Sequence, residues 1–420
     1  MKSLRAVLVV WLACVSMVGV AAAAQNGFYL KDGDRVVFYG DSITEQRLYT
    51  TYAETYVVTR FPQLDVSFVH SGVGGDRVTG GWAGPIDLRL PRDVFAYKPT
   101  VMTIMLGMND GSYRAFDAGI FETYSNGYRH ILDSVKTALP GIRLTLIQPS
   151  PFDDVTRPAN FEGGYNAVLV RYGQFVKELA QQRNCLAADL NTSLVAELEK
   201  AKATDAETAK KIIADRVHPG PAGHLLMAKA LLKAWNAPAT VTAVEIDAEA
   251  AKAVKAENTA VSQIKAAGNL SWTQDDKSLP MPVDMKDAVT KLAMQSSDFF
   301  QAVDWQPLKV TGLKGKQYLL KIDGEEVGTF SRQQLEDGLN LAELATPMVK
   351  QAQAVHDLTL KHNNVHAARW RELQVALGQQ SLPHLSQAVE ALDAVEADLV
   401  ALQRQTAQPK PRHYELLVQE

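Results

Sequence analysis

Residues 36–44 read Val-Val-Phe-Tyr-Gly-Asp-Ser-Ile-Thr, a short apolar run that ends at a glycine and passes directly into polar residues. Such a run, followed by helical spacing over residues 45–60, predicts a buried strand and then a helix. The same alternation continues to residue 237, with strands expected at 66–69, 101–106, 144–147 and 185–190 and helices at 124–139, 160–183 and 221–235. Five strands separated by helices predict an α/β fold built on a doubly wound parallel sheet.

Four short polar or glycine-rich segments follow predicted strands or precede the last helix. They are Gly-Asp-Ser at 40–42, Gly-Val-Gly-Gly-Asp at 72–76, Gly-Met-Asn-Asp at 107–110 and Asp-Arg-Val-His at 215–218. Each segment alone is typical of an ordinary turn. Because the carboxyl ends of parallel strands meet at one edge of a sheet, we expect all four to converge on a single site.

With these motifs, residues 34–235 resemble the SGNH hydrolases, also called the GDSL esterase/lipase family, over about half of the chain. The resemblance implies a flavodoxin-like sheet and a serine hydrolase without metal or organic cofactor. It implies that Ser42 is the nucleophile, His218 the base and Asp215 the residue that orients the base. Ser42, Gly75 and Asn109 would donate to the oxyanion, and Gly74 is an alternative to Gly75.

The chemistry of these residue types agrees with those roles. A serine hydroxyl is a weak nucleophile and needs a neighbouring base, and a histidine with an unperturbed pKa of about 6.5 serves well near neutral pH. An aspartate three residues before the histidine can accept the other imidazole N–H and fix its tautomer. The sequence has no Gly-x-Ser-x-Gly motif, which argues against an α/β-hydrolase elbow.

Several nearby residues allow a second interpretation. Ser42 could simply cap the following helix. The candidates for lining a substrate pocket are Asp41, His70, Asp76 and Asp110. Asp41 could instead hold the turn through backbone hydrogen bonds. His130 and His224 lie in predicted helices and are interpreted as surface or packing residues. The chain has no cysteine cluster, and no metal site is predicted.

The composition is that of a globular protein, with 420 residues, 46% hydrophobic and 21% charged. Lys and Arg total 43 against 47 Asp and Glu, so no basic excess exists to attract nucleic acid or an anionic membrane. Residues 1–24 combine Lys2 and Arg5, an apolar run and a closing stretch of alanines, which predicts a signal peptide cleaved near Ala24. The mature protein is therefore expected to be periplasmic or secreted and not embedded in a membrane.

Pro238 is the predicted boundary between an esterase domain over 25–238 and a smaller α+β accessory domain over 239–420. In the second part, an Ala/Lys/Glu-rich stretch at 247–267 predicts a solvated helix. Strands are expected at 308–311, 317–322 and 326–330, with a hairpin turn at 323–324, and helices at 339–377 and 385–404. The tryptophans at 272, 305 and 370 are expected in the core or between domains rather than stacked on sugars.

The resulting hypothesis is an exported serine esterase that cleaves short-chain acyl esters and removes acetyl groups from carbohydrates. Its partner would be a small-molecule or polysaccharide ester. The enzymatic alternative is a lysophospholipase or thioesterase of the same mechanism, and the alternative from another class is a non-catalytic carbohydrate-binding relative. Oligomeric state and the role of residues 239–420 do not follow from the sequence.

Overall fold

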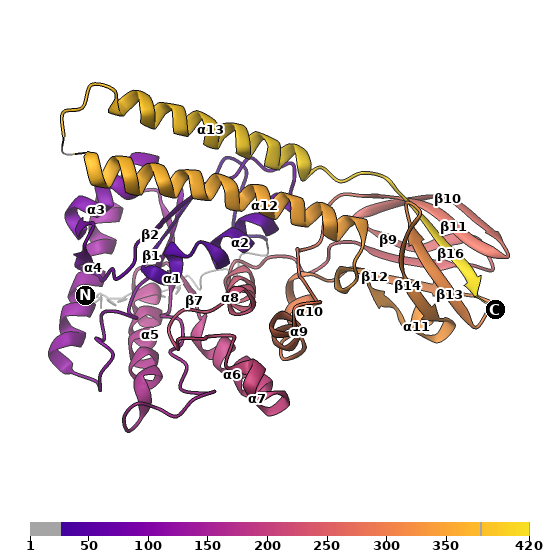
Figure 1. Cartoon of the computed structure of the whole chain (residues 1–420), viewed down its shortest axis with the longest axis horizontal. Coiled ribbons are helices and arrows are strands. Elements are labelled where there is room, and N and C mark those ends of the chain that lie inside the picture. The colour runs from indigo at the N-terminus through magenta and orange to yellow at the C-terminus, as the bar shows by residue number, and fades with distance from the viewer. Residues whose placement is uncertain (1–26, 379, 420) are drawn as a thin grey trace, which may run out of the picture.

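The computed structural model describes residues 27–378 and 380–419. The predicted signal peptide lies outside these residues. Among the described helices, none is both long enough and apolar enough to cross a membrane. A parallel sheet with its flanking helices comes first in the chain, and two further sheets and a long pair of helices follow (Figure 1).

The central sheet has five parallel strands in the order β2-β1-β5-β6-β7. Their bounds are β1 (Arg35–Gly40), β2 (Ser67–Gly72), β5 (Val101–Met105), β6 (Arg143–Ile147) and β7 (Leu186–Ala188). This is the flavodoxin-like order, so the predicted fold class is confirmed. The order reverses between β1 and β5, and a site is expected at that point of the sheet edge.

Helices cover both faces of this sheet, which is why β5 is buried along its whole length. The helices of this part are α1 (Ser42–Glu45), α2 (Leu48–Arg60), α3 (Ile86–Asp93), α4 (Ala118–Ala138), α5 (Gly164–Gln182), α6 (Asn191–Thr204), α7 (Ala206–Ala209) and α8 (Pro221–Ala234). A short two-stranded sheet, β3 (Gly80–Gly81) and β4 (Gly84–Pro85), precedes α3.

The second part of the chain contains two sheets. One has the order β15-β12-β8-β9, with β8 (Ala243–Asp247), β9 (Lys252–Glu257), β12 (Pro307–Thr311) and β15 (Leu339–Asn340). The other has the order β10-β11-β16-β13-β14, with β10 (Thr259–Ala267), β11 (Asn269–Asp276), β13 (Gln317–Ile322), β14 (Glu325–Ser331) and β16 (Arg412–Gln419). Both sheets share a separate core, in which Trp272 stacks on Tyr414.

The helix predicted for 247–267 is wrong, because this stretch forms β9 and β10. Its alanine, lysine and glutamate residues favour a helix locally, but backbone pairing with β8 and β11 decides the outcome. The turn between β10 and β11 contains Gly268, whose φ of +81° suits glycine. That glycine was the local signal for a hairpin.

The predicted boundary at residue 238 does not coincide with the division between the two cores. Three short segments beyond it lead from β11 to β12: the loop around Met281, α9 (Ala288–Gln295) and α10 (Phe299–Val303). Met281, Phe299 and Val303 are fully buried and belong to the core of the central sheet. The two parts of the chain therefore pack as one continuous body at this junction.

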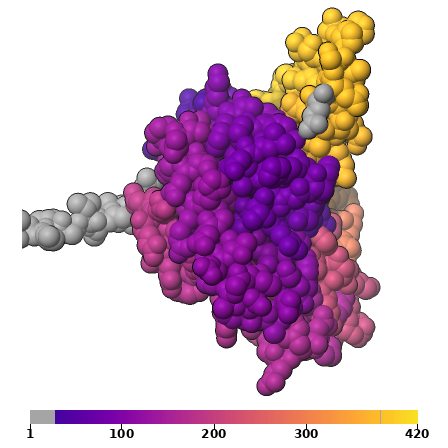
Figure 2. Space-filling view, turned by 90° about the vertical axis from the view of Figure 1, so that its left-hand side faces the viewer, coloured from indigo at the N-terminus to yellow at the C-terminus, as the bar shows by residue number. Residues whose placement is uncertain are grey.

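Residues 347–378 and 380–406 form a helical hairpin that we call the helical arm. It consists of α12 (Pro347–Ala368), a π-helical segment (Arg369–Val375) and α13 (Leu385–Thr406). The arm leaves the second part after β15 and returns to it as β16, and it runs along the central domain in between (Figure 1). Its tip projects beyond the central domain in Figure 2. A helix was expected from residue 339, but Thr346 caps it and Pro347 occupies its first turn.

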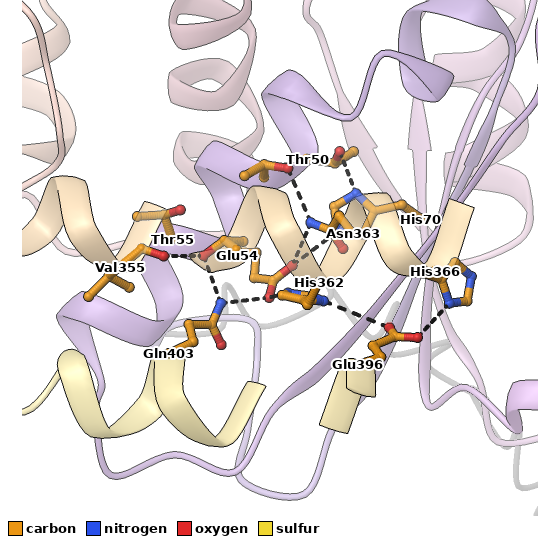
Figure 3. A network of polar contacts seen from close by, with 12 residues as sticks. Thr50, Glu54, Thr55, His70, Val355, His362, Asn363, His366, Glu396 and Gln403 are labelled. Carbon is orange, nitrogen blue, oxygen red and sulfur yellow. Dashed lines mark hydrogen bonds and ion pairs between the residues drawn. The ribbon is translucent and has the colours of Figure 1, made fainter. Parts of the chain in front are cut away.

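A buried carboxylate, Glu54 of α2, anchors the arm (Figure 3). Its Oε1 contacts His362 Nε2 of α12 at 2.6 Å and accepts from Gln403 Nε2 of α13 at 3.0 Å. Its Oε2 contacts His70 Nε2 of β2 at 3.0 Å. Asn363 of α12 also donates to Oε2, at 3.4 Å. One carboxylate thus joins the central sheet to both helices of the arm.

The charges in this cluster are fixed by their neighbours. Burial alone would lower the pKa of His362, but the carboxylates of Glu54 and Glu396 outweigh it and raise this pKa to about 10. Burial opposes ionisation of Glu54 as well, yet His362 and His70 hold its pKa below the usual range. Burial dominates at His70 and lowers its pKa. His362 is therefore the cation of the cluster, and His70 is neutral.

The cluster includes a His-x-x-x-His spacing at residues 362–366, which the sequence-based metal prediction overlooked. His362 and His366 both face Glu396, at 3.8 Å and 3.2 Å, and His362 also faces Glu54. Within the described ranges, no group of three or more histidine, cysteine, aspartate or glutamate residues is arranged to hold a metal ion. The histidines act as ion-pair partners between helices.

We expect His362→Gln to destabilise the protein strongly near pH 6, by about 3–5 kcal/mol, because it leaves Glu54 buried without its cation. The raised pKa of His362 means that its stabilisation is complete below pH ~6.5 and declines as the pH rises through about 10. The difference between wild type and variant in urea midpoint should therefore shrink from pH 6 to pH 9.5.

His130→Gln is the matched control. His130 pairs with Asp87 at 2.6 Å, but both side chains are at least half exposed, so this change should have little effect. A difference between wild type and His362→Gln that does not vary with pH would contradict the assigned charge.

Candidate active site

Ser42 lies directly after β1, at the edge of the sheet where the strand order reverses. Asp41, not Ser42, caps the short helix α1, because its Oδ1 accepts from the backbone N–H of Ile43 at 3.0 Å. The interpretation of Ser42 as the cap is therefore wrong. Its hydroxyl is left available for another partner.

Ser42, His218 and Asp215 form a continuous chain of hydrogen bonds. Ser42 Oγ lies 2.8 Å from His218 Nε2, and His218 Nδ1 lies 2.7 Å from Asp215 Oδ2. The other carboxylate oxygen of Asp215 accepts from the backbone N–H groups of Val217 and His218, at 2.9 and 2.7 Å. Arg216 takes a left-handed conformation, φ +75°, which closes this tight turn.

These contacts also fix the charge of the aspartate. Partial burial raises the pKa of Asp215, but the N–H groups of His218 and Val217 and the His218 ring outweigh it and hold this pKa below its usual value. An ionised Asp215 accepts from His218 Nδ1–H, so Nε2 remains free to accept from the Ser42 hydroxyl.

Two glycines shape the loop after β2. A Cβ atom at Gly72 would lie 2.3 Å from the backbone nitrogen of Glu45, so only glycine lets β2 approach α1 this closely. Gly75 is exposed and has a φ of +77°. A Cβ at Gly74 would meet the Glu45 carboxylate at 2.7 Å.

Asn109 follows β5 and is held at both ends of its side-chain amide. Its Nδ2 donates to the backbone oxygen of Asp76 at 3.1 Å, and its Oδ1 accepts from the Tyr113 hydroxyl at 2.9 Å. Tyr113 is a residue that the sequence analysis missed. It lies four residues after Asn109 in an irregular turn, where no helical or strand periodicity points to it.

Three of the predicted pocket residues are not among those that line the cavity beside Ser42. Asp41, Asp76 and Asp110 are buried beneath the site, where burial raises their pKa values to about 7, 6 and 7. Asp76 forms an ion pair with Arg89, and Asp110 accepts from the Val78 N–H at 2.9 Å. These carboxylates shape the loops that carry the site, which is why turn-forming residues were easily taken for pocket residues.

A cavity of about 610 Å³ opens beside Ser42 and His218. His70 lines it, as predicted, while its ring also contacts Thr50 Oγ1 at 2.7 Å. The central domain contributes Ser42, Glu45, Gln46, Arg47, His70, Ser71, Gly72 and His218. The helical arm contributes Asn364, Ala367, Ala368, Trp370 and Arg371. No local pattern in the sequence indicated that residues 364–371 would line the site.

Comparison with known proteins agrees with this arrangement. Residues 38–226 match the GDSL-like Lipase/Acylhydrolase family, and this range contains all the motifs described above. The central domain therefore matches the SGNH hydrolase family. The protein is accordingly an enzyme that hydrolyses ester bonds.

The SGNH relatives differ in how much of the chain they match. An acetylxylan esterase of Geobacillus stearothermophilus is 26% identical over 219 residues, which cover 48% of this chain and 93% of the relative. A GDSL esterase/lipase of Arabidopsis thaliana is 25% identical over 219 residues, covering 48% of this chain and 87% of the relative. The structure of a gut microbial diltiazem-metabolizing enzyme is 26% identical with a TM-score of 0.79, and the match covers 93% of this chain and 98% of that one. The second part of the chain therefore has a structural counterpart.

The close contact at Gly72 predicts that two alanine variants lose different amounts of activity. Gly72→Ala must displace α1, which begins with Ser42, and should lower kcat/KM for p-nitrophenyl acetate by about tenfold or more. Gly75→Ala meets no atom within 4 Å and adds only backbone strain of about 1–2 kcal/mol, so its loss should be smaller. Equal losses, measured on variants with unchanged thermal transitions, would contradict this reading of the loop.

Proposed function

We propose that the protein is a serine esterase that removes short acyl groups, above all acetyl, from polar alcohols such as carbohydrates. The observation that carries this proposal is the Ser42–His218–Asp215 hydrogen-bond chain at the wall of an open cavity. The geometry supports nucleophilic catalysis, because a serine is activated only when a base lies within hydrogen-bond reach.

In the acylation step, Ser42 Oγ attacks the ester carbonyl carbon while His218 Nε2 takes the hydroxyl proton. The carbonyl oxygen becomes an oxyanion that the backbone N–H groups of Ser42 and Gly75 and the Asn109 amide can stabilise. Tyr113 and the Asp76 carbonyl hold that amide in place. His218 then returns its proton to the leaving oxygen, the ester C–O bond breaks, and the acyl group remains on Ser42.

Deacylation repeats these steps with water as the nucleophile. His218 takes a proton from the water, whose oxygen attacks the acyl-Ser42 carbonyl. The collapse of the second tetrahedral intermediate releases the acid and returns the proton to Ser42 Oγ. Throughout, the ionised Asp215 stabilises the imidazolium form of His218. No step requires a metal or organic cofactor.

The preference for short acyl groups has separate support. One relative is an acetylxylan esterase, and the structure of another is that of a gut microbial diltiazem-metabolizing enzyme. Polar and charged side chains such as Glu45, Asn364 and Arg371 are among those that line the cavity beside Ser42, and they can form hydrogen bonds with a polar alcohol. Residues 1–24 carry the further proposal that the enzyme is exported to where acetylated polysaccharides are found.

Replacing the nucleophile tests the mechanism. Ser42→Ala and His218→Ala should each lower kcat for p-nitrophenyl acetate by about 10³-fold or more, and the double variant should be little worse than either, because the two side chains act as a unit. A fluorophosphonate probe should label the wild type but not Ser42→Ala. Unchanged turnover in a folded Ser42→Ala variant would refute the assignment.

An ester panel tests the substrate class. We expect a higher kcat/KM for acetylated xylan fragments than for decanoyl esters, because the polar and charged side chains of the cavity lining can form hydrogen bonds with a hydroxyl-rich alcohol. The rates of acid release are measured for each ester under the same conditions. A preference of about tenfold or more for decanoyl esters, or about 1.4 kcal/mol in the transition state, would favour the lysophospholipase or thioesterase alternative.

A further inference from the structure

The cavity beside Ser42 is a composite of two parts of the chain that are distant in sequence. The family match ends at residue 226, whereas Asn364, Trp370 and Arg371 of the helical arm lie well beyond it. Trp370 and Arg371 belong to the π-helical segment that continues α12. Such segments are rare and often occur at functional sites, because they displace side chains from the regular helical positions.

Direct contacts hold these arm residues beside the nucleophile. Arg371 forms an ion pair with Glu45, the last residue of α1, with Nη1 and Oε1 2.8 Å apart. Arg47 donates from Nη2 to Asn364 Oδ1 at 3.1 Å. Trp370 Nε1 donates to Asp93 Oδ1 of α3 at 2.6 Å. The wall that the arm contributes is therefore fixed to the elements that surround Ser42.

The position of the cavity indicates which half of the ester it receives. It is lined by Ser42 and His218, whereas Gly75 and Asn109, the proposed oxyanion donors, are not among its lining residues. His218 must deliver a proton to the leaving oxygen, so the alcohol portion has to lie on the His218 side of Ser42. The cavity is thus placed for the alcohol and not for the acyl group.

The chemistry of the arm wall suits an alcohol rich in hydroxyl groups. The Arg371 side chain is 53% exposed and Asn364 is exposed, so both can reach a ligand. The Arg371 guanidinium and the Glu45 carboxylate present hydrogen-bond donors and acceptors side by side, as hydroxyl groups require. Ala367, Ala368 and Trp370 add an apolar surface. A volume of about 610 Å³ far exceeds an acetyl group and lies in the range of ligand sites.

We propose that Arg371 and Asn364 of the helical arm are specificity-determining residues that bind the alcohol portion of the ester, a sugar-like polyol. This inference rests on the proposed function, since it assigns the leaving-group subsite of the same reaction. The arm, which lies outside the family match, thereby selects the substrate on which the Ser42 site acts.

The experiment compares two acetates that differ only in the alcohol. Acetylated xylotriose can fill the cavity, whereas ethyl acetate cannot reach the arm. Arg371→Ala should lower kcat/KM for acetylated xylotriose by about tenfold, mainly through KM, because it removes hydrogen bonds from a charged group. Asn364→Ala should lower it by several-fold. Both variants should lower kcat/KM for ethyl acetate by much less than they lower it for acetylated xylotriose.

Arg332→Ala is the matched control. Arg332 begins α11 (Arg332–Asp337) in the second part of the chain, its side chain is 51% exposed, and it forms an ion pair with Glu336. This variant should leave kcat/KM for both acetates unchanged. Equal losses on both acetates with Arg371→Ala would mean that the residue only supports α1, and no loss on either would mean that it does not contact the alcohol. Either result overturns the inference while leaving the proposed function intact.

The same experiment distinguishes failure of the proposed function from failure of the alcohol subsite. If the wild-type protein hydrolyses neither acetate, the esterase proposal is contradicted, and so is the proposed alcohol subsite. Wild-type protein that cleaves both acetates with the same kcat/KM contradicts only the subsite. The expected result is a wild-type preference for acetylated xylotriose that Arg371→Ala removes.

Discussion

The buried carboxylate of Glu54 is the contact on which the arrangement of the molecule depends. A buried anion is tolerated only when cations and hydrogen-bond donors surround it. Here the donors come from three places in the sequence: β2, α12 and α13. The central sheet and the helical arm must therefore come together before the charge is satisfied. His70 belongs both to this cluster and to the cavity lining, so the anchor of the arm and the wall of the site are adjacent.

The arrangement of the candidate catalytic residues depends on a different and more local constraint. In a doubly wound sheet, the strand order reverses at one point, and the loops after the two flanking strands diverge there. Ser42 follows β1 and Asn109 follows β5, the two strands at that point, and His218 reaches Ser42 from the loop before α8. Short turns with fixed spacing place these groups, which is why glycine at 72 and the Asp41 cap matter more here than the packing of any single side chain.

The difference between long-range contacts and local turns explains which features could be predicted from the sequence. The central sheet was predictable because its strands are continuous apolar runs and its site residues lie at strand ends, both of which are local patterns. The strands at 252–267 were not, because Lys, Ala and Glu favour a helix and only pairing with β8 and β11 decides otherwise. Tyr113 lies in a turn without periodicity, and the arm reaches the site through contacts such as Arg371–Glu45, which join residues 326 positions apart.

The topology of the second part gives the arm its rigidity. The strand that follows the arm, β16, is inserted between β11 and β13, so it pairs on both sides. The strand that precedes the arm, β15, pairs with β12. Both ends of the helical hairpin are thus fixed in sheets, while Glu54 fixes its middle to the central domain. A hairpin held at three places can position Trp370 and Arg371 beside Ser42 without a flexible lid. The second part of the chain then serves the reaction as a scaffold for one wall of the site, and its two sheets have a role even though they contribute no residue to the cavity lining.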